Sequence, residues 1–131
     1  MSDGLLDTSV LIGWEAGRID SGRLPERAAI SALTIAELHL GVLVAADSEE
    51  RARRLETLVL AERAYEPIPV DAAVGRRFAE FVAALRGEGR RAPVLDALIA
   101  ATAIAHGLVL YTQDADFAPF PGLESVLLAP P

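Results

Sequence analysis

The sequence contains no cysteine and no lysine, and only two histidines, His39 and His106. The absence of cysteine excludes disulfides, iron–sulfur clusters, thiolate zinc sites and a cysteine nucleophile. The absence of lysine excludes a Walker A phosphate loop, Schiff-base chemistry and a lysine general base. Two histidines are too few to build a metal site from imidazoles. Because no oxidising compartment is required, we expect a cytoplasmic protein.

Long apolar runs and strong positive charge are also missing. No stretch has the pattern of a signal peptide, and no run of 18 apolar residues predicts a membrane span, so we expect no membrane association. The net charge is −7, and all 12 basic residues are arginine. Such a chain lacks the global positive field of a simple nucleic-acid binder. Its 131 residues are 52% apolar, which excludes wholesale disorder and predicts one domain spanning residues 1–131.

Short apolar segments alternate with segments of helical periodicity. We expect strands at 4–6, 28–31, 66–70, 108–111 and 125–128. We expect helices at 8–14, 34–45, 47–63, 71–87 and 94–105, the third and fourth capped by Asp47 and Asp71, with Gly107 ending the last. Short buried strands that alternate with helices predict an α/β fold, in which a short parallel sheet has helices on both faces.

The helix expected at 34–45 is apolar on more than one side. Its core stripe consists of Ile35, Leu38 and Val42. Leu40, Leu43 and Val44 fall off this stripe. A helix that is apolar beyond its core stripe indicates a surface for a partner.

Carboxylates recur at equivalent places in this pattern. Asp7 ends the first strand, Glu37 is expected in the first turn of the helix after the second strand, and Asp96 in the first turn of the last helix. Asp114 follows the strand at 108–111, and Asp116 comes two residues later. Strand carboxyl ends and helix N-termini meet at one edge of an open α/β sheet. Carboxylates that converge there repel one another unless a hard divalent cation such as Mg²⁺ lies between them.

Each carboxylate also has a purely structural interpretation. Asp7 can be a helix N-cap, and Glu37 can complete a capping box with Thr34. Asp96 can be a first-turn acid favoured by the helix dipole. Asp114 and Asp116 can be turn residues. The pattern alone leaves both interpretations open.

Four segments, LLDTSVLI, TIAELHLGVL, DALIAATAIAHG and LYTQDADF, occur in an order and spacing that resembles the PIN-domain family. Within that family the chain is similar, over almost its whole length, to the VapC ribonuclease toxins of bacterial toxin–antitoxin pairs. The resemblance implies an acidic quartet of metal ligands, with Asp116 as a fifth catalytic member and hydroxyls beside the quartet at Thr8, Ser9 and Thr112. The quartet is Asp7, Glu37, Asp96 and Asp114. The sequence departs from the family pattern at Leu95, directly before Asp96, where many relatives have a polar residue.

The resemblance further implies hydrolysis of RNA phosphodiesters with Mg²⁺ or Mn²⁺, inhibition by a VapB-type antitoxin, and a homodimer. A bound metal suits a chain without lysine, cysteine or a catalytic histidine, because it can activate water. Asp114 or Asp116 is the candidate to orient or deprotonate that water. Two other functions remain as alternatives: a PIN fold that only binds a partner, and a receiver-like phosphoacceptor domain, which the absence of lysine opposes.

Two arginine clusters have two interpretations each. Arg86, Arg90 and Arg91 precede Asp96, and Arg51, Arg53 and Arg54 lie in the third helix. They can line the approach of RNA, or they can form a solvated face with local glutamates. Trp14 is expected to pack against the fold, or, if it is exposed, to form part of a groove for the antitoxin.

Overall fold

Four parallel strands form the central sheet, in the order β2-β1-β3-β4. The computed structural model describes residues 3–117 and 120–128. The strands are β1 (Asp3–Leu6), β2 (Arg27–Ala29), β3 (Val109–Thr112) and β4 (Ser125–Leu127). The helices are α1 (Thr8–Glu15), α2 (Ala32–Leu43), α3 (Ser48–Ala64), α4 (Ala72–Gly87) and α5 (Val94–His106), with 3₁₀ turns η1 (Ser21–Arg23) and η2 (Ala115–Phe117). The predicted α/β fold with a short parallel sheet is confirmed.

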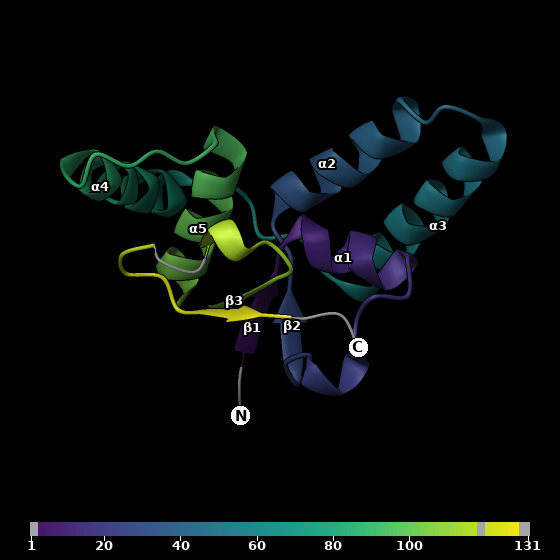
Figure 1. Cartoon of the computed structure of the whole chain (residues 1–131), viewed down its shortest axis with the longest axis horizontal. Helices are drawn as coiled ribbons and strands as arrows, with labels where there is room; N and C mark the ends of the chain where they lie inside the picture. Colours follow the sequence, from purple (N-terminus) through teal and green to yellow (C-terminus); the bar gives the residue numbers. More distant parts are fainter. Residues whose placement is uncertain (1–2, 118–119, 129–131) are drawn as a thin grey trace.

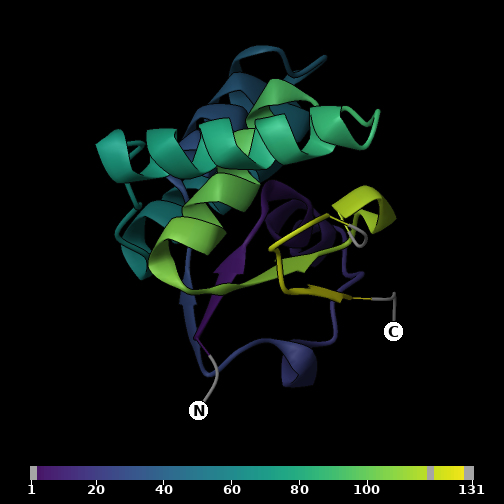
Figure 2. The ribbon, with the colours of Figure 1, turned by 90° about the vertical axis from the view of Figure 1, so that its left-hand side faces the viewer.

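Helices cover both faces of this sheet because successive strand residues point to opposite sides. Leu6 and Tyr111 pack into a cluster with residues of α1, α2 and α3. Their neighbours Leu5 and Leu110 pack into a second cluster with residues of α4 and α5. Figure 1 shows the two groups of helices on opposite sides of the sheet, and Figure 2 views the molecule from the side of α4 and α5.

Side chains at the N-termini start four of the five helices. Asp7, Ser31, Asp47 and Asp71 each accept a hydrogen bond from a backbone N–H in the first turn of α1, α2, α3 and α4. The expected caps at Asp47 and Asp71 are therefore confirmed. α5 ends at Gly107, whose φ of 64° is a conformation that favours glycine.

The strand predicted at residues 66–70 is wrong. Only Ile68 pairs there: its N–H donates to the Ile30 carbonyl and its own carbonyl accepts from Ala32, at 2.9 Å each. Pro67 and Pro69 flank it, and proline has no N–H to donate to a sheet. The two prolines reduce the segment to a single bridge.

The second helix begins two residues earlier than predicted. Ser31, not Thr34, is the N-cap, so Thr34 lies inside α2 with its side chain fully buried. Glu37 consequently lies in the second turn rather than the first, and it is not part of a capping box. Within the described residues, no helix is long and apolar enough to span a membrane.

Candidate active site at the carboxyl edge of the sheet

The register of the sheet brings Asp7 and Thr112 together. β1 and β3 are parallel neighbours in which Leu6 pairs with Tyr111. The pairing continues by one step, since the Asp7 N–H donates to the Tyr111 carbonyl at 3.0 Å. Two residues that are 105 positions apart in the sequence thereby meet at the carboxyl ends of adjacent strands.

The Asp7 carboxylate is almost completely buried and is held by hydroxyl groups. The Thr112 hydroxyl donates to its Oδ2 at 2.5 Å, and the Ser9 hydroxyl donates to its Oδ1 at 2.5 Å. The Val10 N–H also donates to Oδ1, at 3.3 Å, so Asp7 is a helix cap as well. Burial raises the pKa of Asp7, and these hydrogen bonds oppose the increase. The main cost of the ionised side chain is therefore its removal from water.

Glu37 is connected to the same edge through Thr8. The Thr8 hydroxyl donates to Glu37 Oε1 at 2.6 Å and lies 3.1 Å from the Thr34 hydroxyl. Thr34 and Glu37 are one turn apart on α2, and Thr8 directly follows Asp7. Thr8, in the first turn of α1, therefore connects Asp7, which directly follows β1, to Glu37 of α2.

Asp114 is positioned through its backbone. Its N–H donates to the Thr112 hydroxyl at 2.9 Å, and the neighbouring N–H, that of Gln113, donates to the Ser9 hydroxyl at 2.9 Å. The turn after β3 is thus tied to the start of α1. The hydroxyls predicted at Thr8, Ser9 and Thr112 all take part in this network.

Asp96 lies in the first turn of α5 and is half-buried. It lines a depression together with Arg90, Arg91 and two phenylalanines, Phe117 and Phe120. α5 has no side-chain N-cap. Asp96 is the acidic residue of its first turn, where the helix dipole favours a negative charge. Asp116 belongs to η2, but its side chain lies outside the described part of the chain.

Within the described residues, no three acidic or imidazole side chains group closely enough to form a metal site by themselves. The groups at this edge are nevertheless carboxylate and hydroxyl oxygens, the donors that Mg²⁺ and Mn²⁺ prefer. Mg²⁺ retains several waters and needs only one or two carboxylates from a protein. The donor chemistry fits a hard divalent cation, and the quartet of ligands remains a prediction.

Neither Thr34 nor Gln113 was predicted from the sequence to have a role in the candidate site. Thr34 was assigned to a cap, although it is a buried hydroxyl beside Thr8. Gln113 was not assigned a role, yet its side chain donates to the carbonyls of Arg18 and Leu128. The sequence signal that could have identified Gln113 is its place between Thr112 and Asp114, in the TQD segment after a strand.

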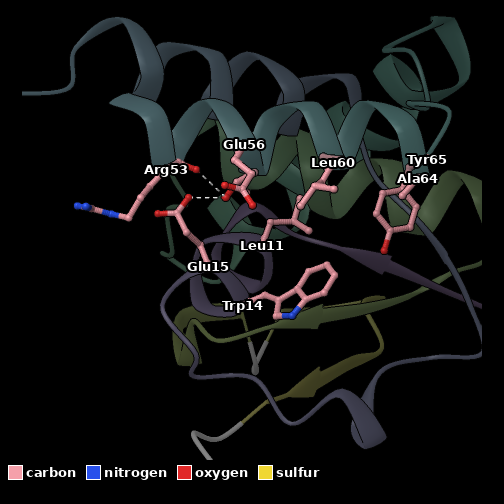
Figure 3. A pocket seen from close by; sticks show the side chains of 10 residues that line it. Leu11, Trp14, Glu15, Arg53, Glu56, Leu60, Ala64 and Tyr65 are labelled. Carbon is pink, nitrogen blue, oxygen red and sulfur yellow. Dashed lines mark hydrogen bonds between the residues drawn. The ribbon is translucent and has the colours of Figure 1, made fainter. Parts of the chain in front are cut away.

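Trp14 does not pack into the core as first expected, because 55% of it is exposed. It lines a groove of about 520 Å³ between α1 and α3. Figure 3 shows Trp14 and Glu15 of α1 facing Glu56 and Leu60 of α3. The Thr57 hydroxyl joins the two helices by donating to Glu15 at 2.5 Å. The groove offers an apolar floor with acidic side chains at its margin.

Comparisons with known proteins identify the family of the chain and agree with its fold. A profile of the PIN domain matches residues 4–123. The chain is 46% identical to Ribonuclease VapC4 of Mycobacterium tuberculosis, over 95% of each sequence. It is 44% identical to Ribonuclease VapC5 of the same organism, over 94% of this chain and 91% of that protein. The crystal structure of VapBC-5, a toxin–antitoxin system of M. tuberculosis, superimposes with a TM-score of 0.89 at 37% identity, covering 98% of this chain and all of that one.

Proposed function

The chain belongs to the PIN-domain family, among relatives named as VapC ribonucleases, and we propose that it is a metal-dependent endoribonuclease that serves as the toxin of a toxin–antitoxin pair. The observation that carries this proposal is the buried Asp7 carboxylate, which two hydroxyls hold at the strand edge where Glu37 and Asp114 are also anchored. A carboxylate whose burial costs free energy is unusual in a merely structural position. We also propose that the protein is cytoplasmic, because a chain without cysteine forms no disulfides and needs no oxidising compartment.

The proposed division of roles follows from how each carboxylate is held. Asp7 has a fixed position, because three donors bind its two oxygens. Glu37, Asp96 and Asp114 would complete the ligand set from α2, α5 and the turn after β3. When bound, a divalent cation lowers the pKa of a coordinated water and neutralises charge on the phosphate.

Asp114, or Asp116 beside it, would accept the proton of the attacking water. The Asp114 backbone is tied to Thr112, whereas the turn leaves its side chain only half-buried. A base needs a defined position and access to substrate. The hydroxyls of Thr8, Ser9 and Thr112 orient carboxylates and do not need to react themselves.

An antitoxin and a second copy of the chain are the proposed protein partners. Leu40 and Leu43 of α2 and its C-cap Val44 are each about 60% exposed or more, as the sequence predicted for a partner surface. The groove lined by Trp14 and Leu60 is a second exposed apolar surface. Exposed apolar surfaces of this kind are typical of protein interfaces. The VapBC-5 structure is that of a toxin–antitoxin system, which supports a VapB-type partner here.

The proposal is tested by incubating the purified protein with structured RNA and Mg²⁺ or Mn²⁺. We expect cleavage that EDTA stops. Asp96→Asn should abolish cleavage and growth inhibition without unfolding the protein, because the amide lacks the charge that a divalent cation requires.

Asp71→Asn is the matched control. Asp71 caps α4 by accepting from the Val74 N–H at 3.0 Å, and asparagine caps about as well as aspartate. Its activity should stay within a few-fold of the wild type. Cleavage undiminished in EDTA would refute the metal-dependent mechanism. Absence of RNA cleavage under every metal condition would favour the alternative of a PIN fold that only binds.

A further inference from the structure

Arg18 lies at the edge of the candidate active site because two hydrogen bonds and a glycine hold its backbone there. The Arg18 N–H donates to the Gly13 carbonyl at 2.7 Å, and the Gln113 side chain donates to the Arg18 carbonyl at 3.2 Å. A Cβ at position 13 would lie 2.2 Å from Gln113 Oε1. Glycine at this position therefore allows the Gln113 side chain to pass α1 and reach Arg18.

Two depressions, one lined by Asp114 directly before η2 and one lined by residues of η2, each combine an arginine with a candidate catalytic carboxylate. Arg18 lines the first together with Ser9 and Asp114. Arg91 lines the second together with Asp96. η2 directly follows Asp114 in the sequence, and Ala115 and Phe117 at its ends line the second depression. The linings of the two depressions are therefore adjacent in the sequence at Asp114 and Ala115.

Arg18 and Arg91 differ in their charge environment from the five arginines that form ion pairs within the described residues. Arg53, Arg54 and Arg77 form ion pairs with glutamates on their own helices. Arg18 and Arg91 are exposed and form no ion pair with any residue in the described ranges. Their charge is therefore available to a ligand.

Arg90 supports the wall beside Arg91. Its guanidinium lies 5.2 Å from the centre of the Phe120 ring, and it pairs with Glu88 at 3.4 Å. A cation over an aromatic ring is held in place by the charge distribution of the ring. The segment before α5 is thereby attached to the segment after η2, which keeps Arg91 near Asp96.

We propose that Arg18 and Arg91 bind backbone phosphates of RNA on either side of the bond that is cleaved. The strand would run from one depression to the other across Asp114, η2 and Asp96. This inference rests on the proposed ribonuclease function and adds positioning residues to it. An acidic protein with a net charge of −7 repels RNA, so two unpaired cations beside the carboxylates supply the local attraction.

The first test measures binding without cleavage. A fluorescein-labelled, mixed-sequence RNA of about 20 nucleotides is titrated with protein in EDTA across a salt series, and anisotropy gives the affinity. Each of Arg18→Gln and Arg91→Gln should reduce the slope of log affinity against log salt by about 0.7, the value for one phosphate of a single strand. At ~0.1 M salt the affinity should fall about five-fold for each variant.

The second test separates binding from chemistry. With Mn²⁺, each variant should raise KM about five-fold and leave kcat within about two-fold, as expected for an interaction made equally in ground and transition states. Arg76→Gln is the matched control, because Arg76 is exposed on α4 and lines neither depression. The substitution removes the same charge as the two test variants. Melting temperatures should be unchanged in all three variants.

Unchanged slopes and KM values in the Arg18 and Arg91 variants would overturn the inference, and RNA cleavage by the wild type would then leave the proposed function intact. An equal loss in Arg76→Gln would also overturn it, because the attraction would then be diffuse. If the wild type binds RNA but never cleaves it, the ribonuclease proposal fails, while the salt slopes still decide whether these arginines hold phosphates.

Discussion

At the scale of single residues, Thr112 connects two of the proposed catalytic residues. Its hydroxyl donates to Asp7 Oδ2 at 2.5 Å and accepts from the Asp114 N–H at 2.9 Å. It is buried at the end of β3. One hydroxyl therefore holds two of the proposed catalytic residues in a fixed relation.

We predict that replacing the Thr112 hydroxyl lowers both the stability of the fold and the rate of RNA cleavage. Thr112→Val keeps the shape but removes the donor to Asp7 Oδ2 and the acceptor of the Asp114 N–H, which should cost about 1–3 kcal/mol. Chemical denaturation and RNA cleavage measure the two effects, and Thr112→Ser should restore most of both. If valine behaves like serine, the hydroxyl is not what orients the site.

The stability loss should also depend on pH, because the lost bond is to a carboxylate whose pKa is raised by burial. The Thr112 hydroxyl stabilises the ionised form, so its removal costs most above the folded-state pKa of Asp7. As the pH falls through that raised pKa, the difference between the wild type and Thr112→Val should shrink. A difference that grows on acidification would contradict this assignment.

At the scale of elements, α2 has two distinct apolar surfaces. Leu38 and Val42 are buried in the core, whereas Leu43 is 66% exposed. The structure thus confirms the division of this helix that the sequence predicted, although the helix spans Ala32–Leu43 and not 34–45. An exposed leucine next to Leu40 and Val44 adds little to the stability of the monomer.

Leu43→Glu should therefore weaken an assembly without destabilising the fold. We expect its melting temperature to stay within about 2 °C of the wild type at a concentration where the protein is monomeric. Light scattering, alone and with the antitoxin, should show loss of one complex. Leu55→Glu on α3, where the leucine is 47% exposed, is the control for a new surface charge. Unaltered assembly in both conditions would exclude this face of α2 as an interface.

At the scale of the whole molecule, the cost of burying Asp7 couples the fold to metal binding. The sequence suggested that repulsion among carboxylates would destabilise the metal-free protein. Instead, the principal cause that raises the pKa of Asp7 is burial. The expected consequence is similar, since a cation at this edge would stabilise the folded state only.

A thermal melt across a Mn²⁺ series tests this coupling. At about 100 times the dissociation constant, metal should add about 2.7 kcal/mol to the free energy of unfolding, or roughly 10 °C in melting temperature. Asp7→Asn keeps the Val10 cap and removes a buried charge, but its amide group no longer accepts from both the Ser9 and the Thr112 hydroxyls, so its stability in EDTA should stay close to that of the wild type. It should lose most of the response to metal and nearly all RNA cleavage. An intact response to Mn²⁺ in this variant would leave Asp7 as a helix cap only.

The sequence by itself determined the strand and helix alternation, the caps at Asp47 and Asp71, and the placement of Asp7 at the end of a strand, because these depend on local periodicity and on neighbouring residues. It also determined the apolar surface of α2. It missed the single bridge at Ile68, which lies between two prolines, and the start of α2, where Ser31 and Thr34 are both residue types that cap helices.

Only the tertiary structure decided how the candidate site is held together. The bond from Thr112 to Asp7 depends on the register of β1 against β3, and the bond from Thr8 to Glu37 depends on how α2 packs beside α1. The same holds for the position of Arg18, which requires Gln113 to pass Gly13. These contacts join residues from 29 to 105 positions apart, and no local pattern in a single sequence encodes a pairing over such separations.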